Sequence, residues 1–161
     1  MSSGLHVVRA GSGPRILLIH GSAADHRTWT ILLASALRER FTLIAYDRRP
    51  EASTIEAHAD DAAAVLAAEP GPAVVVGSSF GAVVALELLR RHPTAAAGAV
   101  LIEPPLHSSD DAPAIRATFL DDFDRRAATA GGPAAGELFL RTVLGDEGFE
   151  RMPRIFQAEA M

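Results

Sequence analysis

Short, almost continuously apolar runs alternate with amphipathic stretches over the first two thirds of the chain. Such runs are typical of parallel strands that are covered on both faces, and the stretches between them repeat their apolar residues at helical spacing. Strands that alternate with helices predict βαβ units with right-handed crossovers. We therefore expect an α/β fold with a mostly parallel sheet and helices on both faces. The expected strands are residues 15–21, 41–47, 73–76 and 99–103, with an outer strand at 5–10.

Helices are expected in the intervals between these strands. In the first interval Thr28 is a suitable N-cap for a helical apolar pattern. That pattern consists of Trp29, Leu32, Leu33, Ala36 and Leu37. In the second interval Ser53 and Glu56 have capping-box spacing before a helix that runs to about Ala68. Its apolar face would consist of Ile55, Ala59, Ala62 and Leu66. A third helix would follow the strand at 73–76 and end at His92-Pro93.

The pattern changes after Leu106. Residues 110–161 carry apolar side chains at helical spacing, with interruptions at 131–133 and at Gly145, and they contain no further strand pattern. We therefore expect two domains. Residues 1–108 would form the α/β core, and residues 109–161 would form a helical cap segment of two or three helices.

The pentapeptide Gly77-Ser78-Ser79-Phe80-Gly81 lies between an apolar run and an amphipathic stretch. A G-x-S-x-G sequence between a strand and a helix is typical of the sharp turn that presents a nucleophilic serine. In that turn the serine backbone is strained and its Oγ is exposed, while the flanking glycines let neighbouring backbone pass where a Cβ would clash. The bare pattern is common, but the strand and helix context makes Ser79 the candidate nucleophile.

Composition limits the other kinds of function. The net charge is −5 and the charges are spread along the chain, so no basic patch suggests a nucleic acid or an anionic membrane as a partner. The absence of cysteine excludes disulfides, thiolate metal sites and a cysteine nucleophile. The N-terminus lacks the basic region of a signal peptide, and no apolar stretch is long enough to cross a bilayer. We expect a cytoplasmic protein that acts on a small molecule.

Three short motifs occur in an order and spacing that resemble the α/β-hydrolase fold family of serine hydrolases. They are His20-Gly21, Tyr46-Asp47-Arg48-Arg49 and Gly77-Ser78-Ser79-Phe80-Gly81. The segment Ile102-Glu103-Pro104-Pro105 resembles the sixth strand and the start of the cap in a bacterial subgroup of that family. The resemblance covers essentially the whole chain and corresponds to the first two thirds of such an enzyme.

This resemblance implies roles for particular residues. Ser79 would be the nucleophile, and the backbone N–H groups of Phe80 and Ser22 would form an oxyanion hole. Some members of the fold place their catalytic acid at the end of the sixth strand, which makes Glu103 a candidate; alternatively its carboxylate holds the hinge near Pro104 through hydrogen bonds. The family order continues to a histidine on later strands, for which this sequence has no counterpart.

Six histidines are available as a base for Ser79. His20 lies beside the expected oxyanion loop, where its ring would brace the loop rather than accept a proton. Four others lie on helices or on the outer strand, where a solvated side chain is expected: His6, His26, His58 and His92. His107 lies nearest to the carboxyl ends of the strands, where such sheets bind ligands, but we do not favour it as a base.

Two acidic segments, Asp110-Asp111 and Asp121-Asp122-Asp124, resemble a metal cluster only superficially. The flanking residues provide no histidine, and the spacing is that of the solvated face of a helix. The sequence predicts no metal and no cofactor.

The sequence thus predicts a serine hydrolase for a small, mostly apolar ester or another activated acyl substrate. One alternative is a non-catalytic remnant or binding module that keeps the serine turn without a base. Another is a half-enzyme to which a second chain supplies the histidine. The strand at 99–103 would lie at an open edge of the sheet with unpaired backbone groups, so we also expect self-association.

Overall fold

The computed structural model describes residues 4–52, 54–68, 70–71, 73–106, 112–154 and 157. The chain divides into two compact units, Met1–Leu106 and His107–Met161. The sequence pattern places this boundary after residue 108. The first unit contains the sheet together with its covering helices, and the second unit is helical.

The sheet of the first unit has five strands in the order β1-β3-β2-β4-β5. β2, β3, β4 and β5 pair in parallel, and the outer strand β1 is antiparallel to β3. This arrangement confirms the predicted α/β fold with a mostly parallel sheet. The strands are β1 (Val7–Ala10), β2 (Arg15–Ile19), β3 (Thr42–Tyr46), β4 (Ala73–Ser78) and β5 (Ala96–Ile102).

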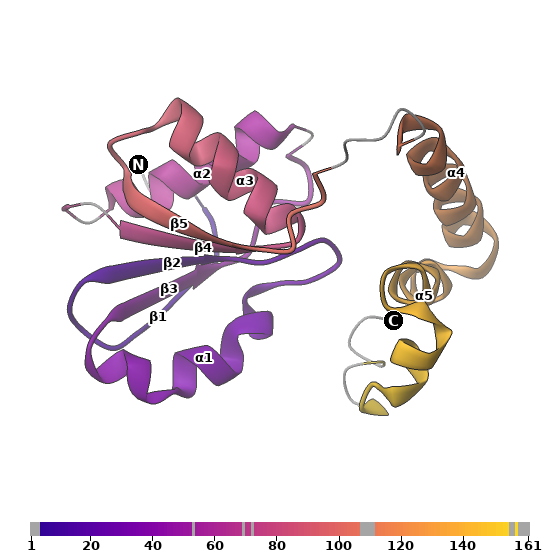
Figure 1. Ribbon diagram of the computed structural model, residues 1–161, viewed down its shortest axis with the longest axis horizontal. Helices are drawn as coiled ribbons and strands as arrows, with labels where there is room; N and C mark the ends of the chain where they lie inside the picture. The colour runs from indigo at the N-terminus through magenta and orange to yellow at the C-terminus, as the bar shows by residue number, and fades with distance from the viewer. Residues whose placement is uncertain are drawn as a thin grey trace. The chain divides into compact units, whose positions relative to one another are not determined.

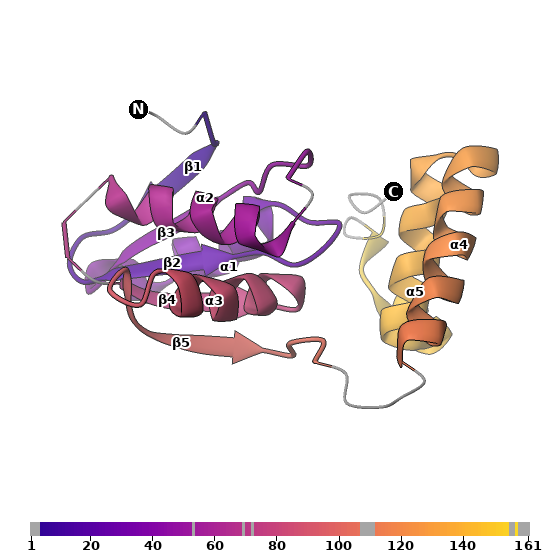
Figure 2. The ribbon, with the colours of Figure 1, turned by 90° about the horizontal axis from the view of Figure 1, so that it is seen from above.

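Helices cover both faces of this sheet, as Figure 1 shows. α2 (Ile55–Ala67) and α3 (Phe80–Arg91) lie side by side on one face, which is clearest in Figure 2. α1 (Thr30–Ala34) covers the other face. Because successive side chains of a strand point to opposite faces, Leu17 of β2 joins the core cluster beneath α2 and α3, whereas Leu18 packs with Trp29 in the second cluster.

The first predicted helix is wrong in detail, because it is broken into three short elements. The 3-10 helix η1 (His26–Trp29) precedes α1, and the 3-10 helix η2 (Ala36–Glu39) follows it. The N-cap is Asp25, whose carboxylate accepts a hydrogen bond from the Arg27 N–H at 2.8 Å, and not Thr28. Ser35 caps η2 in the same way. It lies inside the apolar stretch and therefore divides a helix that spacing alone presents as continuous.

The second helix also differs from its prediction. Thr54 is the N-cap of α2, and its Oγ1 accepts a hydrogen bond from the Ala57 N–H at 3.1 Å; Ser53 lies outside the described residues. Ile55 is 36% exposed instead of facing the core. His58 is 6% exposed, so the prediction of a solvated side chain is wrong for it. The buried face of the helix is therefore rotated toward His58 and Asp61.

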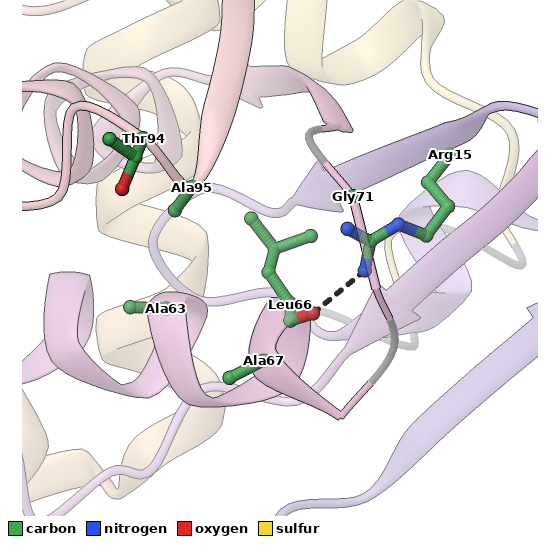
Figure 3. Close-up of a pocket in the computed structure, with 7 residues that line it drawn as sticks. All are labelled: Arg15, Ala63, Leu66, Ala67, Gly71, Thr94 and Ala95. Carbon is green, nitrogen blue, oxygen red and sulfur yellow. Dashed lines mark hydrogen bonds between the residues drawn. The ribbon is translucent and has the colours of Figure 1, made fainter.

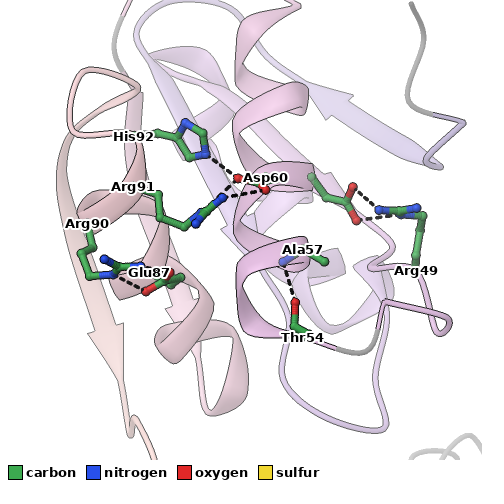
Figure 4. A network of polar contacts seen from close by, with 9 residues as sticks. Arg49, Thr54, Ala57, Asp60, Glu87, Arg90, Arg91 and His92 are labelled. Atoms are coloured by element: carbon green, nitrogen blue, oxygen red, sulfur yellow. Dashed lines mark hydrogen bonds and ion pairs between the residues drawn. The ribbon is translucent and has the colours of Figure 1, made fainter.

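Polar contacts fasten α2 to its neighbours at two places, shown in Figure 4. Asp60 of α2 binds Arg91 and His92 at the end of α3. On the next residue, Asp61, both carboxylate oxygens accept hydrogen bonds from Arg49, at 2.8 and 2.7 Å. Arg49 lies in the loop after β3, so this paired contact fixes the loop that leaves the carboxyl end of the sheet.

The second unit consists of two helices that pack against each other, α4 (Ala112–Ala130) and α5 (Gly132–Arg151). Both predicted interruptions are confirmed: the helices are separated at Gly131, and Gly145, with a φ of 73°, interrupts α5. The acidic residues of α4 are exposed, as expected for its solvated face: Asp121, Asp122 and Asp124. Asp110 and Asp111 lie outside the described residues.

β5 forms one edge of the sheet, as the sequence predicts. In the described part of the chain it pairs with β4 alone, and its Val100 and Ile102 are 52% and 41% exposed. Self-association through this edge stays a prediction. Among the described residues, no helix combines the length and the apolar character that crossing a bilayer requires.

Candidate active site

Ser79 occupies the sharp turn between β4 and α3. It is the residue before the first turn of α3, with φ 52° and ψ −122°, so the predicted strained conformation is confirmed. The two flanking glycines are required by their surroundings. A Cβ on Gly77 would lie 2.3 Å from the Gly81 carbonyl oxygen, and a Cβ on Gly81 would lie 2.3 Å from the carbonyl oxygen of Ile19.

The loop after β2 runs directly against this turn. A Cβ on Gly21 would lie 3.2 Å from the Ser79 Cβ and 3.8 Å from its Oγ. The backbone of Gly81 is in turn pressed against the carbonyl groups of Ile19 and His20. The parallel pairing of β2 with β4 therefore places Gly21, in the loop after β2, beside the Ser79 side chain.

Strained backbone is concentrated at this end of the sheet. In the described parts of the chain, the non-glycine residues with positive φ are Ala23, Ser79 and Glu103. They follow β2, β4 and β5, which are neighbouring strands. The Ser79 N–H donates a 2.8 Å hydrogen bond to the Ile102 carbonyl oxygen, so Glu103 directly follows the residue that holds the serine backbone. Conformations of this kind persist where the surrounding structure imposes them, which is common at functional sites.

The structure brings Glu103 close to Ser79 along the backbone but does not join their side chains. Glu103 is exposed, with a φ of 48°. Its position at the end of β5 agrees with either role that the sequence leaves open, the catalytic acid or the hinge carboxylate. Ser22 is exposed, and Phe80 is partly buried at the start of α3.

His20 is buried, and both of its ring nitrogens are occupied. Nε2 accepts a 3.1 Å hydrogen bond from the Arg48 N–H, which leaves Nδ1 as the donor to the Gly21 carbonyl oxygen at 2.9 Å. Burial, followed by the nearby Arg48 charge, lowers the pKa of the ring. A neutral imidazole with both nitrogens engaged braces the loop, as the sequence predicts, and is not a base for Ser79.

Arg48 connects the groups around this loop. Its Nη2 donates to the Gly21 carbonyl oxygen at 2.6 Å and its Nε donates to the His20 carbonyl oxygen at 3.3 Å. Its guanidinium carbon lies 4.9 Å from the centre of the Phe80 ring. The other neighbour of that ring is His58, whose ring meets it edge-on at 5.6 Å. One cation therefore links the loop after β2 to the first residue of α3.

Within the described residues, no histidine or carboxylate forms a hydrogen bond with the Ser79 hydroxyl. His26 is bound to Asp47, and His92 is bound to Asp60. His58 is buried, and its pKa is lowered by burial and then by Arg48. His107 lies outside the described residues. The described part of the site therefore contains the serine turn and the adjoining loop without a base.

A pocket of about 280 Å³ lies elsewhere, at the amino ends of the strands, and is drawn in Figure 3. It is lined by Arg15 at the start of β2, by residues near the end of α2 and by Thr94 and Ala95 before β5. The Arg15 Nη1 donates to the Leu66 carbonyl oxygen at 2.7 Å. Ligands of parallel sheets bind at the opposite, carboxyl ends of the strands, so this pocket is not the candidate site.

Sequence reasoning missed two participants, Arg48 and His58. The sequence indicates Arg48 only as part of a motif, because an arginine in a loop gives no signal of the carbonyl groups that it will bind. The predicted apolar face of this helix contains Ala59, and His58 is the residue before it. A face shifted by one position toward the N-terminus includes His58.

Comparison with known proteins shows which family shares this fold and this serine turn. The sequence model of the alpha/beta hydrolase family matches residues 16–160. Lipase LipV of Mycobacterium tuberculosis is 38% identical to this chain, over 80% of the chain and 55% of the lipase. An uncharacterized hydrolase of Bacillus subtilis, YraK, is 40% identical over 55% of the chain and 36% of its own length.

Solved structures of alpha/beta hydrolases have the same fold as this chain. An alpha/beta hydrolase from Sphaerobacter thermophilus has a TM-score of 0.77 and 26% identity, over 97% of this chain and 65% of that structure. A thermophilic esterase from Thermogutta terrifontis has a TM-score of 0.75 and 24% identity, over 99% of this chain and 62% of that structure. The chain thus spans about half or less of these two sequence relatives, and under two thirds of each structure.

Proposed function

The chain belongs to the alpha/beta hydrolase family, and on that premise we propose that its site is that of a serine esterase with Ser79 as the nucleophile. The observation that carries the proposal is the strained serine, with a φ of 52°, held between two glycines that no larger residue can replace. At the carboxyl end of a central strand, glycine would meet any structural need better than a strained serine, because glycine adopts this conformation without strain.

In the proposed reaction the Ser79 Oγ attacks the carbonyl carbon of an ester while its proton passes to a base. The carbonyl oxygen becomes a tetrahedral oxyanion, which then collapses with loss of the alcohol. Water attacks the resulting acyl-serine in the same way and releases the carboxylic acid and the free hydroxyl. The protein must therefore supply donors for the oxyanion and a group that moves the proton.

The backbone around Gly21 supports Ser22 as one oxyanion donor. The Gly21 carbonyl oxygen accepts hydrogen bonds from Arg48 Nη2 and from His20 Nδ1. In a trans peptide the N–H points opposite to the carbonyl group, so the N–H of Ser22 is turned away from Arg48. The second proposed donor, the N–H of Phe80, belongs to the first turn of α3, where backbone N–H groups lack partners within the helix and the helix dipole favours negative charge.

We assign Arg48 the role of holding the backbone N–H groups of Ser22 and Phe80 in position relative to each other. It binds the carbonyl groups of His20 and Gly21 on one side and lies over the Phe80 ring on the other. Its charge is close enough to lower the pKa values of His20 and His58. Arg48 acts on the reaction through the positions of Ser22 and Phe80, so it is a positioning residue.

The substrate class follows from the relatives together with the site. Lipase and esterase are the activities named for two proteins that this chain resembles. A turn of this geometry serves acyl transfer, and we propose a carboxylic ester with a small, mostly apolar acyl group. Glu103 stays a candidate for the acid, and the base lies outside the set of described histidines.

The proposal is tested with an activated aryl ester and a fluorophosphonate probe. We expect slow ester hydrolysis and slow labelling of Ser79, because no base adjoins the hydroxyl in the described part of the chain; sites that lack a triad member keep an acceleration on the order of 10³ to 10⁴ over water. Ser79→Ala should abolish both signals, while the matched variant Ser78→Ala should keep them. Labelling or turnover that survives in Ser79→Ala would overturn the assignment.

The same experiment distinguishes the alternatives. If the folded chain shows no hydrolysis and no labelling, the result indicates a non-catalytic binding module. Activity per chain that rises steeply with protein concentration would indicate a base donated by a second chain. Glu103→Ala separates the two roles of that residue, because loss of a catalytic acid lowers kcat at unchanged stability, whereas loss of a hinge carboxylate lowers the stability.

A further inference from the structure

Three polar side chains from separate segments meet beside β1 and the end of β3. They are His6, which directly precedes β1, His26 at the start of η1, and Asp47, which directly follows β3. Each offers one nitrogen or oxygen atom, and these three atoms lie within 4.8 Å of one another. The rings of His6 and His26 have their centres 4.8 Å apart and are tilted by 49°.

The backbone holds two of these residues in place. The Asp47 N–H donates to the His6 carbonyl oxygen at 3.0 Å, which continues the antiparallel pairing of β1 with β3. Asp47 Oδ1 accepts 2.8 Å hydrogen bonds from both the backbone N–H and the ring Nδ1 of His26. The three candidate ligand residues are therefore brought together by the pairing of β1 with β3 and by the hydrogen bonds between Asp47 and His26.

The chemistry of the set suits a transition metal. Two imidazoles and one carboxylate are a common ligand set for divalent first-row ions, and Zn–N and Zn–O distances are about 2.0 to 2.2 Å. At such bond lengths the ligand atoms around one ion lie roughly 3 to 3.5 Å apart. The His26 Nδ1 and Asp47 Oδ1 atoms are 2.8 Å apart already, and the exposed His6 can close the remaining gap by rotating its ring.

The charges nearby are compatible with a bound cation. Asp47 is partly buried, and its Oδ1 accepts two hydrogen bonds from His26, so the site already presents an electron-pair donor oxygen next to an imidazole. Asp25 adds negative charge close enough to act on Asp47, but its own carboxylate is paired with Arg27 at 2.8 Å. Among the described residues the ligand set therefore ends at His6, His26 and Asp47, with water completing the coordination.

We propose that His6, His26 and Asp47 bind one divalent transition-metal ion, Zn²⁺ or a similar ion, that fastens the start of β1 to η1 and to the end of β3. The ion takes the place of the hydrogen atom between His26 Nδ1 and Asp47 Oδ1, and the neutral imidazole then carries its hydrogen on Nε2. The sequence predicts no metal, because the ligands are about 20 residues apart along the chain and no acidic segment contains them.

The test titrates the untagged, metal-free chain with ZnCl₂ by calorimetry and with CoCl₂ by visible absorption. We expect one ion per chain and a Co²⁺ spectrum that reports nitrogen ligands. His6→Ala should weaken binding at least tenfold, as loss of a ligand costs no less than loss of a group that orients one. His6 is exposed and its carbonyl group remains in the variant, so the strand pairing should be unaffected.

The matched control is His92→Ala. His92 Nε2 lies 2.7 Å from Asp60 Oδ1, so it forms the same kind of pair, but the neighbour of that pair is Arg91, a cation, and not a third ligand. This variant should bind Zn²⁺ as the unaltered chain does. His26→Ala and Asp47→Asn should weaken binding as His6→Ala does. The proposal is overturned if millimolar Zn²⁺ does not bind, if His6→Ala binds unchanged, or if His92→Ala loses as much affinity.

Discussion

The two ends of the parallel sheet are built in opposite ways. At the carboxyl end, three non-glycine residues of the described chain adopt positive φ values, and glycine backbones are pressed against carbonyl groups. At the amino end, the buried side chain of Arg15 donates to the Leu66 carbonyl oxygen in the last turn of α2, which also accepts from the Ala68 N–H. The first end contains strain, whereas the second end contains an additional hydrogen bond from a charged donor to the end of a helix.

This difference separates function from stability within one sheet. Strained conformations cost about 1 to 3 kcal/mol each and are kept where a precise geometry is needed. A buried hydrogen bond between a charged donor and a helix carbonyl contributes about 1.5 to 3 kcal/mol and has no effect on the reacting atoms. Substitutions at the two ends should therefore change activity and stability independently, and the following variants test that separation.

The largest effect is expected for Gly81→Ala. The new Cβ would lie 2.3 Å from the Ile19 carbonyl oxygen and 2.5 Å from that of His20, and backbone atoms on two elements would have to move. We expect a loss of more than about 4 kcal/mol in the free energy of unfolding, measured by urea denaturation, or loss of the folded chain. Gly98→Ala is the control, since a Cβ there meets nothing within 4 Å, and it should change stability by less than about 0.5 kcal/mol. Equal effects would contradict the tight contact at Gly81.

Arg15→Met tests the amino end. The variant keeps most of the aliphatic chain but leaves the Leu66 carbonyl without its 2.7 Å charged donor. We expect stability to fall by about 1 to 3 kcal/mol while the rate of aryl ester hydrolysis per folded chain stays unchanged. Arg38→Met, at an exposed position, should change neither quantity. A fall in kcat for the folded Arg15 variant would show that the two ends are coupled.

Ser79→Gly tests the carboxyl end, and here we expect the stability to rise instead of fall. Glycine adopts a φ of 52° without strain, so the variant should be more stable by about 1 kcal/mol even though it has lost its hydroxyl and its activity. Ser78→Gly, one residue earlier at the end of β4, should instead lose about 0.5 to 1 kcal/mol because glycine weakens a strand. If Ser79→Gly is destabilised as much as Ser78→Gly, the serine is not strained.

How much of this could be predicted depends on how local each feature is. The strands and the serine turn depend on neighbouring residues, and the sequence indicates them directly through the apolar runs and the glycines around Ser79. Periodicity does not indicate the break in the first helix, because it ignores the Ser35 side chain, which takes up a backbone N–H group inside the apolar stretch. The burial of His58 and the contacts of Arg48 depend on Phe80 and Gly21, which are distant in sequence and adjacent only in the folded sheet.

The smallest expected effect concerns pH and acts through His58, which is buried on α2 against the Phe80 ring. Burial, and then the charge of Arg48, lowers the pKa of its ring from the ordinary value of 6.5, while Asp61 opposes this and Arg49 adds to it. The unfolded chain therefore takes up a proton before the folded chain does. The stability linked to His58 is fully present above about pH 6.5 and decreases as the pH falls from there toward the lower pKa of the folded state.

Replacing this ring should therefore flatten the pH dependence of stability. His58→Leu removes the titrating group together with a buried Nδ1 that has no hydrogen-bond partner among the described residues. We expect the loss of stability between about pH 7.5 and 5.5, measured from urea midpoints, to be smaller in this variant than in the unaltered chain. It should not disappear, because burial also lowers the pKa of His20. Arg38→Met should keep the original slope, and a His58→Leu variant with that same slope would show that the His58 ring is not the group that titrates.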